Sequence, residues 1–164
     1  MTSDDLLAYL ADQHISATTH DHPAVHTVED SRRLRGDIPG IHTKNLFLRD
    51  SKKTFFLVVA DEAATVNLKD LRHKIGAKGN LSFGAADVLL DMLGVTPGSI
   101  SLLALVNDAT HNVTLVVDQS LLAAETINCH PLSNRRTTSL SAEALRQFLA
   151  NTGHSPLSIS LDGK

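Results

Sequence analysis

The stretch NLFLRDSKKTFFLVVA, residues 45–60, contains two apolar runs on either side of the polar tetrapeptide DSKK. Leu, Phe and Val make up most of both runs, and aromatic, β-branched and other apolar residues are enriched in strands. A short polar connection between two such runs is typical of a β-hairpin. We therefore expect strands over 45–49 and 54–60, with Lys44 at the start of the first strand.

Periodicity on both sides of this hairpin predicts an alternation of short helices and strands. Leucines three and four positions apart indicate helices, and Ser3, Thr27 and Ser141 are residue types that cap helix N-termini. Gly36 and Gly94 are suited to end two of these helices. The mixed order predicts an α/β (α+β) fold with a mixed, largely antiparallel sheet flanked by short helices. The expected helices cover 3–14, 28–35, 68–75, 85–93 and a segment after Ser141; the further strands cover 15–21, 101–107, 113–118, 126–128 and 157–161, and 134–139 is a polar connection.

Length and composition limit the class of protein. The chain has 164 residues, a formal net charge of −3 and one cysteine, Cys129. This length favours a single domain over residues 1–164. The longest apolar runs fall short of the roughly 18 residues that a membrane-spanning helix needs. The N-terminus is acidic where a signal peptide carries positive charge. We expect a cytoplasmic protein with no membrane segment, no internal disulfide and no Cys-based zinc site.

Positive charge is concentrated in one part of the chain. Residues 31–78 contain eleven Lys and Arg against five Asp and Glu, a local net charge of +6, whereas residues 1–30 contain six acids and no Lys or Arg. Phosphates attract clustered Lys and Arg, so a positive surface on an acidic protein is compatible with binding the end of a nucleic acid. A solvated helix face gives the same pattern, and charge alone leaves both interpretations open.

The sequence contains no strong signal for a metal or an activated nucleophile. The run HDHPAVH, residues 20–26, contains three histidines and one aspartate. Their spacing matches no recognised set of metal ligands, so we predict no metal and no cofactor. We interpret His20 and His22 as strand-end histidines bonded to backbone before a proline turn. Cys129 and His130 are neighbours, which point to opposite faces of a strand and form a poor nucleophile–base pair. G-x-S-x-G and phosphate-loop motifs do not occur in the sequence.

Four polar motifs follow one another along the chain. They are HPAVHTVED (22–30), HTKNLFLRD (42–50), GVTPGSIS (94–101) with LVND (105–108), and HPLSN (130–134) with TTSLS (137–141). Together they resemble the bacterial aminoacyl-tRNA deacylases of the prolyl-tRNA editing family, which includes YbaK-like proteins and the editing domain inserted in bacterial prolyl-tRNA synthetases. The resemblance covers nearly the whole chain and is greatest to the PrdX or ProXp-ala branch, which removes alanine mischarged on proline tRNA. It implies the YbaK/ProRS editing-domain fold.

The resemblance implies hydrolysis of the ester between alanine and the terminal ribose of tRNA(Pro), which maintains translation fidelity. The neighbouring ribose hydroxyl activates this ester and is implied to assist the attack, so the protein needs to supply positioning and modest charge stabilisation. By the match of motifs, Lys44 would hold the terminal phosphate or ribose, or stabilise developing charge. Asn45 would orient the substrate through its amide, and His130 would shape the aminoacyl pocket and position or exclude water.

The remaining site residues follow from the same motifs. Ser99 and Ser101, with the Gly98 backbone, would donate hydrogen bonds near the ester carbonyl or the α-amine. A synthetase pocket that fits proline rejects the smaller alanine by only about 1–3 kcal/mol, so a second, smaller site is needed for discrimination. We expect the walls of that site to be formed by Ile41, Leu46 and Phe47. We expect the tRNA acceptor stem to be bound by Lys69, Arg72, Lys74 and Lys78.

Several alternatives remain open at the level of sequence. Activity on tRNA mischarged with serine, cysteine or threonine is compatible with the same motifs. A non-catalytic tRNA- or synthetase-binding module would use the same residues without turnover, and a small-molecule hydrolase would reuse the fold and ignore tRNA. The expected partner is the acceptor end of mischarged tRNA(Pro), with no DNA and no membrane. The residues do not decide whether prolyl-tRNA synthetase is a second partner.

Overall fold

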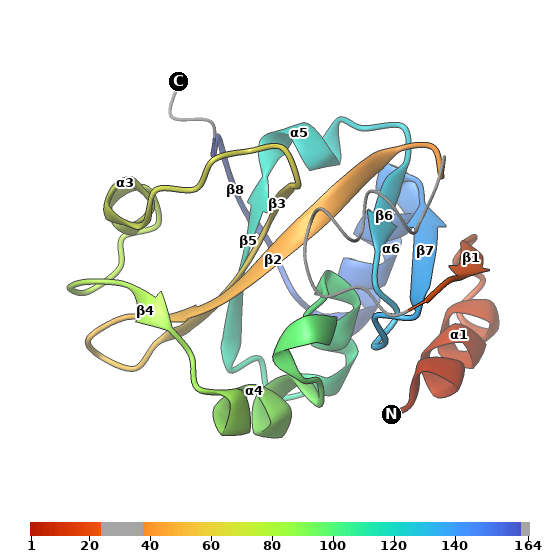
Figure 1. Ribbon diagram of the computed structural model, residues 1–164, viewed down its shortest axis with the longest axis horizontal. Helices are drawn as coiled ribbons and strands as arrows, with labels where there is room; N and C mark the ends of the chain where they lie inside the picture. The colour runs from red at the N-terminus through yellow and green to blue at the C-terminus, as the bar shows by residue number, and fades with distance from the viewer. Residues whose placement is uncertain (24–37, 162–164) are drawn as a thin grey trace.

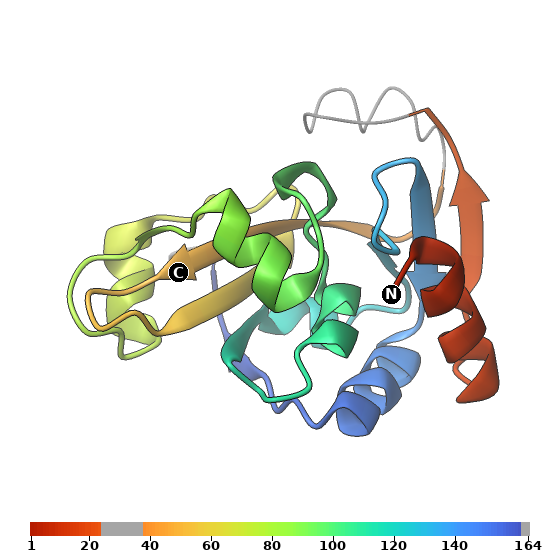
Figure 2. The same cartoon turned by 90° about the horizontal axis from the view of Figure 1, so that it is seen from below.

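The computed structural model describes residues 1–23 and 38–161. Its elements are α1 (Ser3–Asp12), β1 (Thr18–Asp21), β2 (Ile41–Arg49), β3 (Phe55–Asp61), α3 (Leu68–Lys74), β4 (Ser82–Phe83), α4 (Ala86–Leu93), the 3-10 helices η1 (Pro97–Ser99) and η2 (Leu102–Asn107), β5 (Val113–Asp118), α5 (Gln119–Leu122), β6 (Ile127–Cys129), β7 (Arg136–Leu140), α6 (Ala142–Thr152) and β8 (Leu157–Ile159). β2 crosses the molecule from β6, β7 and β1 at one end to β4 and α3 at the other (Figures 1 and 2).

The described residues form one α/β domain around a mixed eight-stranded sheet, as the sequence predicts. The strand order is β1-β7-β6-β2-β3-β5-β8, and β4 pairs with β2 outside this path. The pairs β1–β7, β7–β6, β2–β3 and β2–β4 are antiparallel. The pairs β6–β2, β3–β5 and β5–β8 are parallel. No helix in the described part of the chain is long and apolar enough to cross a membrane.

The predicted hairpin of β2 and β3 is confirmed, and its turn is built around the buried Asp50. The two strands pair over residues 43–49 of β2. The Asp50 carboxylate accepts hydrogen bonds from the backbone N–H groups of Lys52, Thr54 and Lys78 at 2.9–3.0 Å. Burial raises the pKa of Asp50, but these three donors and the charge of Lys78 outweigh burial and hold the pKa below its ordinary value.

One edge of β2 is paired only near its two ends. On that edge β2 runs parallel to β6 over residues 41–42 and antiparallel to β4 over residues 48–49. Between these pairings, no strand in the described part of the chain lies against residues 43–46 on that edge, although β3 pairs with them on the other. We call this interruption the sheet break. Lys44 and Asn45 both lie in it.

Two hydrophobic clusters cover the two faces of the central strands. Successive strand residues point to opposite faces, so Phe47 and Leu57 belong to the larger cluster, whereas Leu48 and Phe56 belong to the smaller one. The larger cluster also takes buried residues from α1, α4, η2 and α6, and the smaller cluster takes Leu71 from α3. The two faces of β2 therefore meet different helices.

Most of the predicted helices are confirmed with small shifts at their ends. The first helix is capped by Thr2 rather than Ser3, because the Thr2 hydroxyl accepts the N–H of Asp5. Helix α4 ends at Gly94, which has a left-handed φ of 69°. Helix α6 is capped by Ser141, as predicted. The helix predicted over 28–35 lies outside the described residues.

Two sequence predictions are wrong in type. The apolar run predicted as a strand over 101–107 is the 3-10 helix η2, because the Ser101 hydroxyl caps it by accepting the N–H of Leu103 at 3.1 Å. The polar connection predicted over 134–139 largely becomes strand β7, which lies between β1 and β6. Its polar side chains are paired: the Thr138 hydroxyl lies 2.8 Å from the Thr19 hydroxyl.

Candidate active site

Lys44 lies on the face of β2 that carries the smaller cluster. Leu46 and Leu48 of the same face pack in that cluster, and the Lys44 ammonium donates a hydrogen bond to the carbonyl oxygen of the buried Ala64. The turn that presents this carbonyl is fixed by Asp61, whose carboxylate accepts the N–H of Ala63 at 2.9 Å. An ammonium has three donors, so Lys44 is held by the fold and can still donate to a phosphate or ribose oxygen.

Asn45 points to the opposite face of β2, toward the larger cluster. Its Oδ1 atom is buried, and among residues 1–23 and 38–161 it is the only buried side-chain nitrogen or oxygen atom without a hydrogen-bond partner. A buried polar atom left unsatisfied costs about 1–3 kcal/mol. Such atoms are rare in native folds, and each calls for an explanation such as a bound water or ion, strain or a catalytic role. The Asn45 oxygen is therefore a candidate acceptor for a substrate donor.

His130 lies at the end of β6, at the start of the loop that leads into β7. Its Nδ1 lies 3.0 Å from the carbonyl oxygen of Arg136. A carbonyl can only accept, so Nδ1 carries a proton and donates this hydrogen bond. The partly buried Leu132 of the same loop packs against the larger cluster, which is the cluster on the Asn45 face. His130 is thus oriented by the backbone of its own loop.

The loop of Gly98, Ser99 and Ser101 lies beside the His130 loop. A Cβ atom added at the exposed Gly98 would lie 3.5 Å from Nδ2 of Asn134. Ser101 is fully buried and its oxygen is used as the cap of η2. Ser99 is buried, and its backbone N–H donates to the carbonyl of Thr96. The backbone around Gly98 is therefore more accessible to a ligand than either serine hydroxyl.

The three predicted wall residues do not share one face of β2. Ile41 and Phe47 pack with the larger cluster, and Phe47 stacks on Phe55 with ring centroids 5.4 Å apart. Leu46 packs with the smaller cluster, on the Lys44 side. The structure therefore brings Ile41 and Phe47 to the face of Asn45 and separates Leu46 from them.

The predicted tRNA-binding residues lie in or just after α3, on the same side of β2 as Lys44. Lys69, Lys74 and Lys78 are exposed, and Arg72 is half-buried. The Arg72 guanidinium donates to the Asn80 side chain at 2.8 Å. The Lys78 backbone belongs to the Asp50 turn, so the hairpin and the region around α3 are joined. Three of these cations lie in α3, which is at the end of the molecule opposite β6 and β7 in Figure 1.

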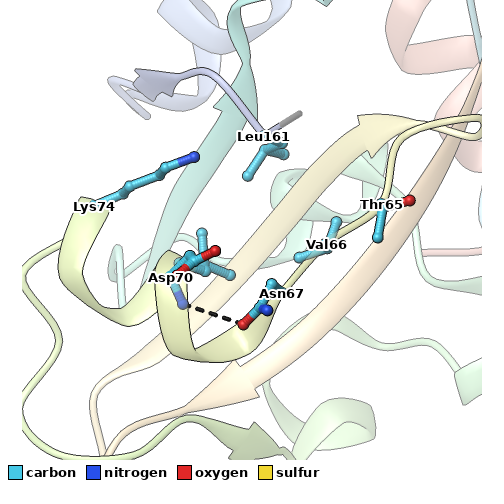
Figure 3. Close-up of a pocket in the computed structure, with 7 residues that line it drawn as sticks. Thr65, Val66, Asn67, Asp70, Lys74 and Leu161 are labelled. Atoms are coloured by element: carbon cyan, nitrogen blue, oxygen red, sulfur yellow. Dashed lines mark hydrogen bonds between the residues drawn. The ribbon is translucent and has the colours of Figure 1, made fainter. Parts of the chain in front are cut away.

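Two cavities flank α3. One, of about 310 Å³, is lined by Lys69 and Arg72 among others. The other, of about 190 Å³, adjoins the turn that holds Lys44, and Lys74 extends across it toward Leu161 (Figure 3). The ammonium of Lys74 donates to the carbonyl of Ser160 at 2.7 Å. The lining of the second cavity is Thr65, Val66, Asn67, Asp70, Leu71, Lys74 and Leu161.

Two observations on the described residues concern the cysteine and the possible metal ligands. Burial raises the pKa of the Cys129 thiol to about 12, so it stays protonated and inert at neutral pH, in keeping with its predicted packing role. No group of three or more His, Cys, Asp or Glu side chains within residues 1–23 and 38–161 could hold a metal ion.

Two side chains near His130 have contacts that the sequence did not reveal. His22 was predicted to bond to backbone at a strand end, and its Nδ1 does lie 2.8 Å from the carbonyl of Pro23. Its Nε2, however, lies 2.8 Å from the hydroxyl of Thr137, across the β1–β7 pair. Arg136 joins Asp4 and Asp21 through ion pairs of 2.7 and 2.9 Å. The long-range pairing of β1 with β7 places Asp21 opposite Arg136, next to His22 and Thr137.

Comparison with known proteins identifies the family. Prolyl-tRNA editing protein ProX of Acetoanaerobium sticklandii is 34% identical over 157 residues, covering 95% of each chain. Prolyl-tRNA synthetase associated domain-containing protein 1 of Danio rerio is 35% identical over 160 residues, covering 96% of this chain and 86% of the relative. A solved structure described as a candidate trans-editing enzyme for prolyl-tRNA synthetase shares the fold, with a TM-score of 0.70, 15% identity and coverage of 99% and 97%. Residues 22–148 match the aminoacyl-tRNA editing domain, and the chain therefore belongs to that family.

Proposed function

We propose that this protein is a trans-editing aminoacyl-tRNA deacylase that hydrolyses mischarged Ala-tRNA(Pro), as in the PrdX or ProXp-ala branch. The observation that carries the proposal is the buried, unpartnered Asn45 oxygen beside Lys44 at the sheet break. Membership of the editing family supports this reaction class. A relative of similar length named for prolyl-tRNA editing supports proline tRNA as the substrate.

The placement of Lys44 and Asn45 suggests how the end of the tRNA is bound. Lys44 lies on the same face as the basic residues of α3, and Asn45 lies on the face of the His130 loop. We infer that the terminal nucleotide crosses the open edge of β2 at the sheet break. Lys44 would then hold the terminal phosphate or ribose, while the Asn45 oxygen accepts a hydrogen bond from the α-ammonium of the alanyl group.

The chemistry requires no covalent intermediate. Water attacks the ester carbonyl carbon, the new C–O bond forms, and the bond to the ribose oxygen breaks. One proton leaves the attacking water and one is taken up by the ribose oxygen, which yields alanine and a tRNA with a free hydroxyl on its terminal ribose. We assign His130 the task of positioning that water, because its contact with the Arg136 carbonyl fixes the orientation of the ring. Backbone N–H groups near Gly98 would stabilise the carbonyl oxygen.

The substrate preference follows from size. A pocket that rejects proline and admits alanine needs walls close to Asn45, and Ile41 and Phe47 are the predicted wall residues on that face. Phe47 is held rigidly, because it is 2% exposed and stacked on Phe55. A rigid aromatic wall excludes a larger ring by steric overlap, which a flexible wall would not do.

The tRNA acceptor stem would be held by Lys69, Arg72, Lys74 and Lys78. Their attraction to phosphates predicts that binding weakens steeply as the salt concentration rises. The names of the animal relatives associate them with prolyl-tRNA synthetase. We therefore propose prolyl-tRNA synthetase as a second partner, which would deliver the mischarged tRNA.

The test is hydrolysis of labelled Ala-tRNA(Pro) by the purified protein, beside Pro-tRNA(Pro), Cys-tRNA(Pro), Ser-tRNA and Thr-tRNA. We expect loss of alanine alone. Lys44→Ala should lower kcat/KM by about 100- to 1000-fold, the range seen when a charge-stabilising group is removed. Lys52→Ala, which removes an exposed lysine from the turn of the same hairpin, is the matched control and should leave the rate within about twofold.

Other outcomes correct the proposal in defined ways. Hydrolysis of a different aminoacyl group would keep the reaction class and replace alanine as the substrate. Binding of tRNA without hydrolysis of any ester would replace the deacylase with a binding module. Equal losses in Lys44→Ala and Lys52→Ala would show that only the summed charge matters.

A further inference from the structure

The loop that begins at His130 leads into β7. There, two histidines form hydrogen bonds with three consecutive residues. The backbone N–H of His22 donates to the carbonyl of Arg135 at 2.8 Å. The carbonyl of Arg136 accepts the His130 Nδ1 proton at 3.0 Å. The hydroxyl of Thr137 lies 2.8 Å from the His22 Nε2. The two rings lie 6.5 Å apart between their centroids.

The donors and acceptors of the His22 ring can be assigned from its partners. Its Nδ1 faces the carbonyl of Pro23, which only accepts, so Nδ1 carries the proton. In the neutral ring, Nε2 then accepts the hydroxyl proton of Thr137. His22 thus uses both ring nitrogens on the protein and is not arranged to carry out chemistry itself.

We propose that His22 is a positioning residue that fixes the His130 imidazole through Thr137, an inference that rests on the proposed deacylase function. Arg135 and Thr137, which His22 holds, flank the residue whose carbonyl orients His130. Loss of the His22 bond to Thr137 lets that carbonyl shift, and the His130 ring shifts with it. A displacement of about 1 Å at a reacting group can cost about 100-fold in rate.

Two substitutions at position 22 separate the two ring nitrogens. His22→Gln places an amide oxygen near the Nε2 position and keeps an acceptor for Thr137. His22→Asn reaches only the Nδ1 position and keeps a donor for Pro23 alone. We expect His22→Asn to lower kcat for Ala-tRNA(Pro) about 10- to 100-fold with little change in KM, and His22→Gln to retain most of the rate.

Thr137→Val tests the same bond from its other partner with almost no change in shape. It should reproduce the loss in His22→Asn, and the double variant should lose no more than either single variant. In a His130→Ala background, His22→Asn should have no further effect on kcat. Thr19→Val is the matched control, because it removes a hydroxyl pair of 2.8 Å across the same two strands without touching Arg135 to Thr137; it should leave the rate unchanged.

A second readout does not depend on activity. In the ¹⁵N NMR spectrum of the full chain, the His130 Nδ1 proton should exchange with water at least several-fold faster in His22→Asn than in His22→Gln. Unchanged exchange, or a loss in His22→Asn that adds fully to the loss in Thr137→Val or His130→Ala, overturns the positioning role. If the wild-type protein hydrolyses no aminoacyl-tRNA, the proposed function fails, while the exchange experiment still decides whether His22 positions His130.

Discussion

Asn45 and Asp50 belong to the same hairpin, and their buried oxygen atoms differ in what they contact. The Asp50 carboxylate accepts three backbone N–H groups, from Lys52, Thr54 and Lys78. The Asn45 oxygen, also buried, has no partner in the described part of the chain. A satisfied buried oxygen fixes the shape of a turn, whereas an unsatisfied one lowers the stability of the fold. The difference separates a residue that builds the hairpin from one that is available to a ligand.

A second buried carboxylate follows the Asp50 pattern. Asp108 accepts the N–H groups of Asn112 and Val113 at 2.9 Å and contacts Nε2 of the buried His154 at 3.0 Å. It ties the segment before β5 to the segment after α6. The carboxylates of Asp50 and Asp108 are thus both hydrogen-bonded, whereas the buried amide oxygen of Asn45 has no partner among the described residues.

The largest effect that would sharpen this contrast is expected from Asn45→Ala. We expect kcat/KM for Ala-tRNA(Pro) to fall about 100-fold, because the substrate loses a preorganised acceptor. The melting temperature should stay the same or rise, because no hydrogen bond is lost and an unsatisfied buried oxygen is removed. Deacylation kinetics and thermal unfolding on the same preparation measure both effects.

Asn45→Asp is the companion variant, since it keeps an oxygen at the same place. It should retain more activity than Asn45→Ala if the oxygen accepts from an α-ammonium. A marked drop in melting temperature for Asn45→Ala would instead mean that the amide supports the fold, and the contrast with Asp50 would disappear.

Asp50→Ala should show the reverse pattern. The three N–H groups lose their acceptor, so we expect the free energy of unfolding to fall by about 2–3 kcal/mol. The rate of deacylation should change by less than about twofold, because Asp50 lies six residues from Lys44, or roughly 20 Å along an extended strand. Urea unfolding and kinetics below the unfolding transition separate the two quantities. A tenfold loss of kcat with normal stability would place Asp50 in the active site.

The sequence could predict the hairpin and most helices because their signals are local. The apolar runs of β2 and β3 and the polar turn between them are read directly from neighbouring residues. Gly94 and Ser141 likewise mark helix ends by their own chemistry. The run LLALVN was predicted as a strand, because a short buried apolar run gives the same pattern in a strand and in a helix. Ser101, which caps η2, was the local signal for the helix.

The sheet break and the His22 bond could not be predicted because they depend on distant pairings. Lys44 and Asn45 stand out as motif residues, yet only the separate pairing of β6 and β4 with β2 leaves an open edge beside them. The alternation of β2 separates Leu46 from Phe47, although both were predicted as pocket walls. β7 is polar and has no strong strand signal of its own, so the position of His22 opposite it was hidden.

The smallest effect concerns the pH dependence of the Asp50 turn. The pKa of Asp50 in the folded protein lies below its ordinary value of 3.8, so the folded state binds the proton less readily than the unfolded state. Its contribution to stability is fully present above 3.8 and is lost as the pH falls through the folded-state pKa. The unfolding free energy of the wild type should therefore decrease more steeply than that of Asp50→Asn as the pH falls below 3.8 toward the lowered folded-state pKa. Parallel curves would mean that the carboxylate charge adds nothing to the turn beyond what an amide supplies, and Asp50 would then resemble Asn45 more closely than its three hydrogen bonds suggest.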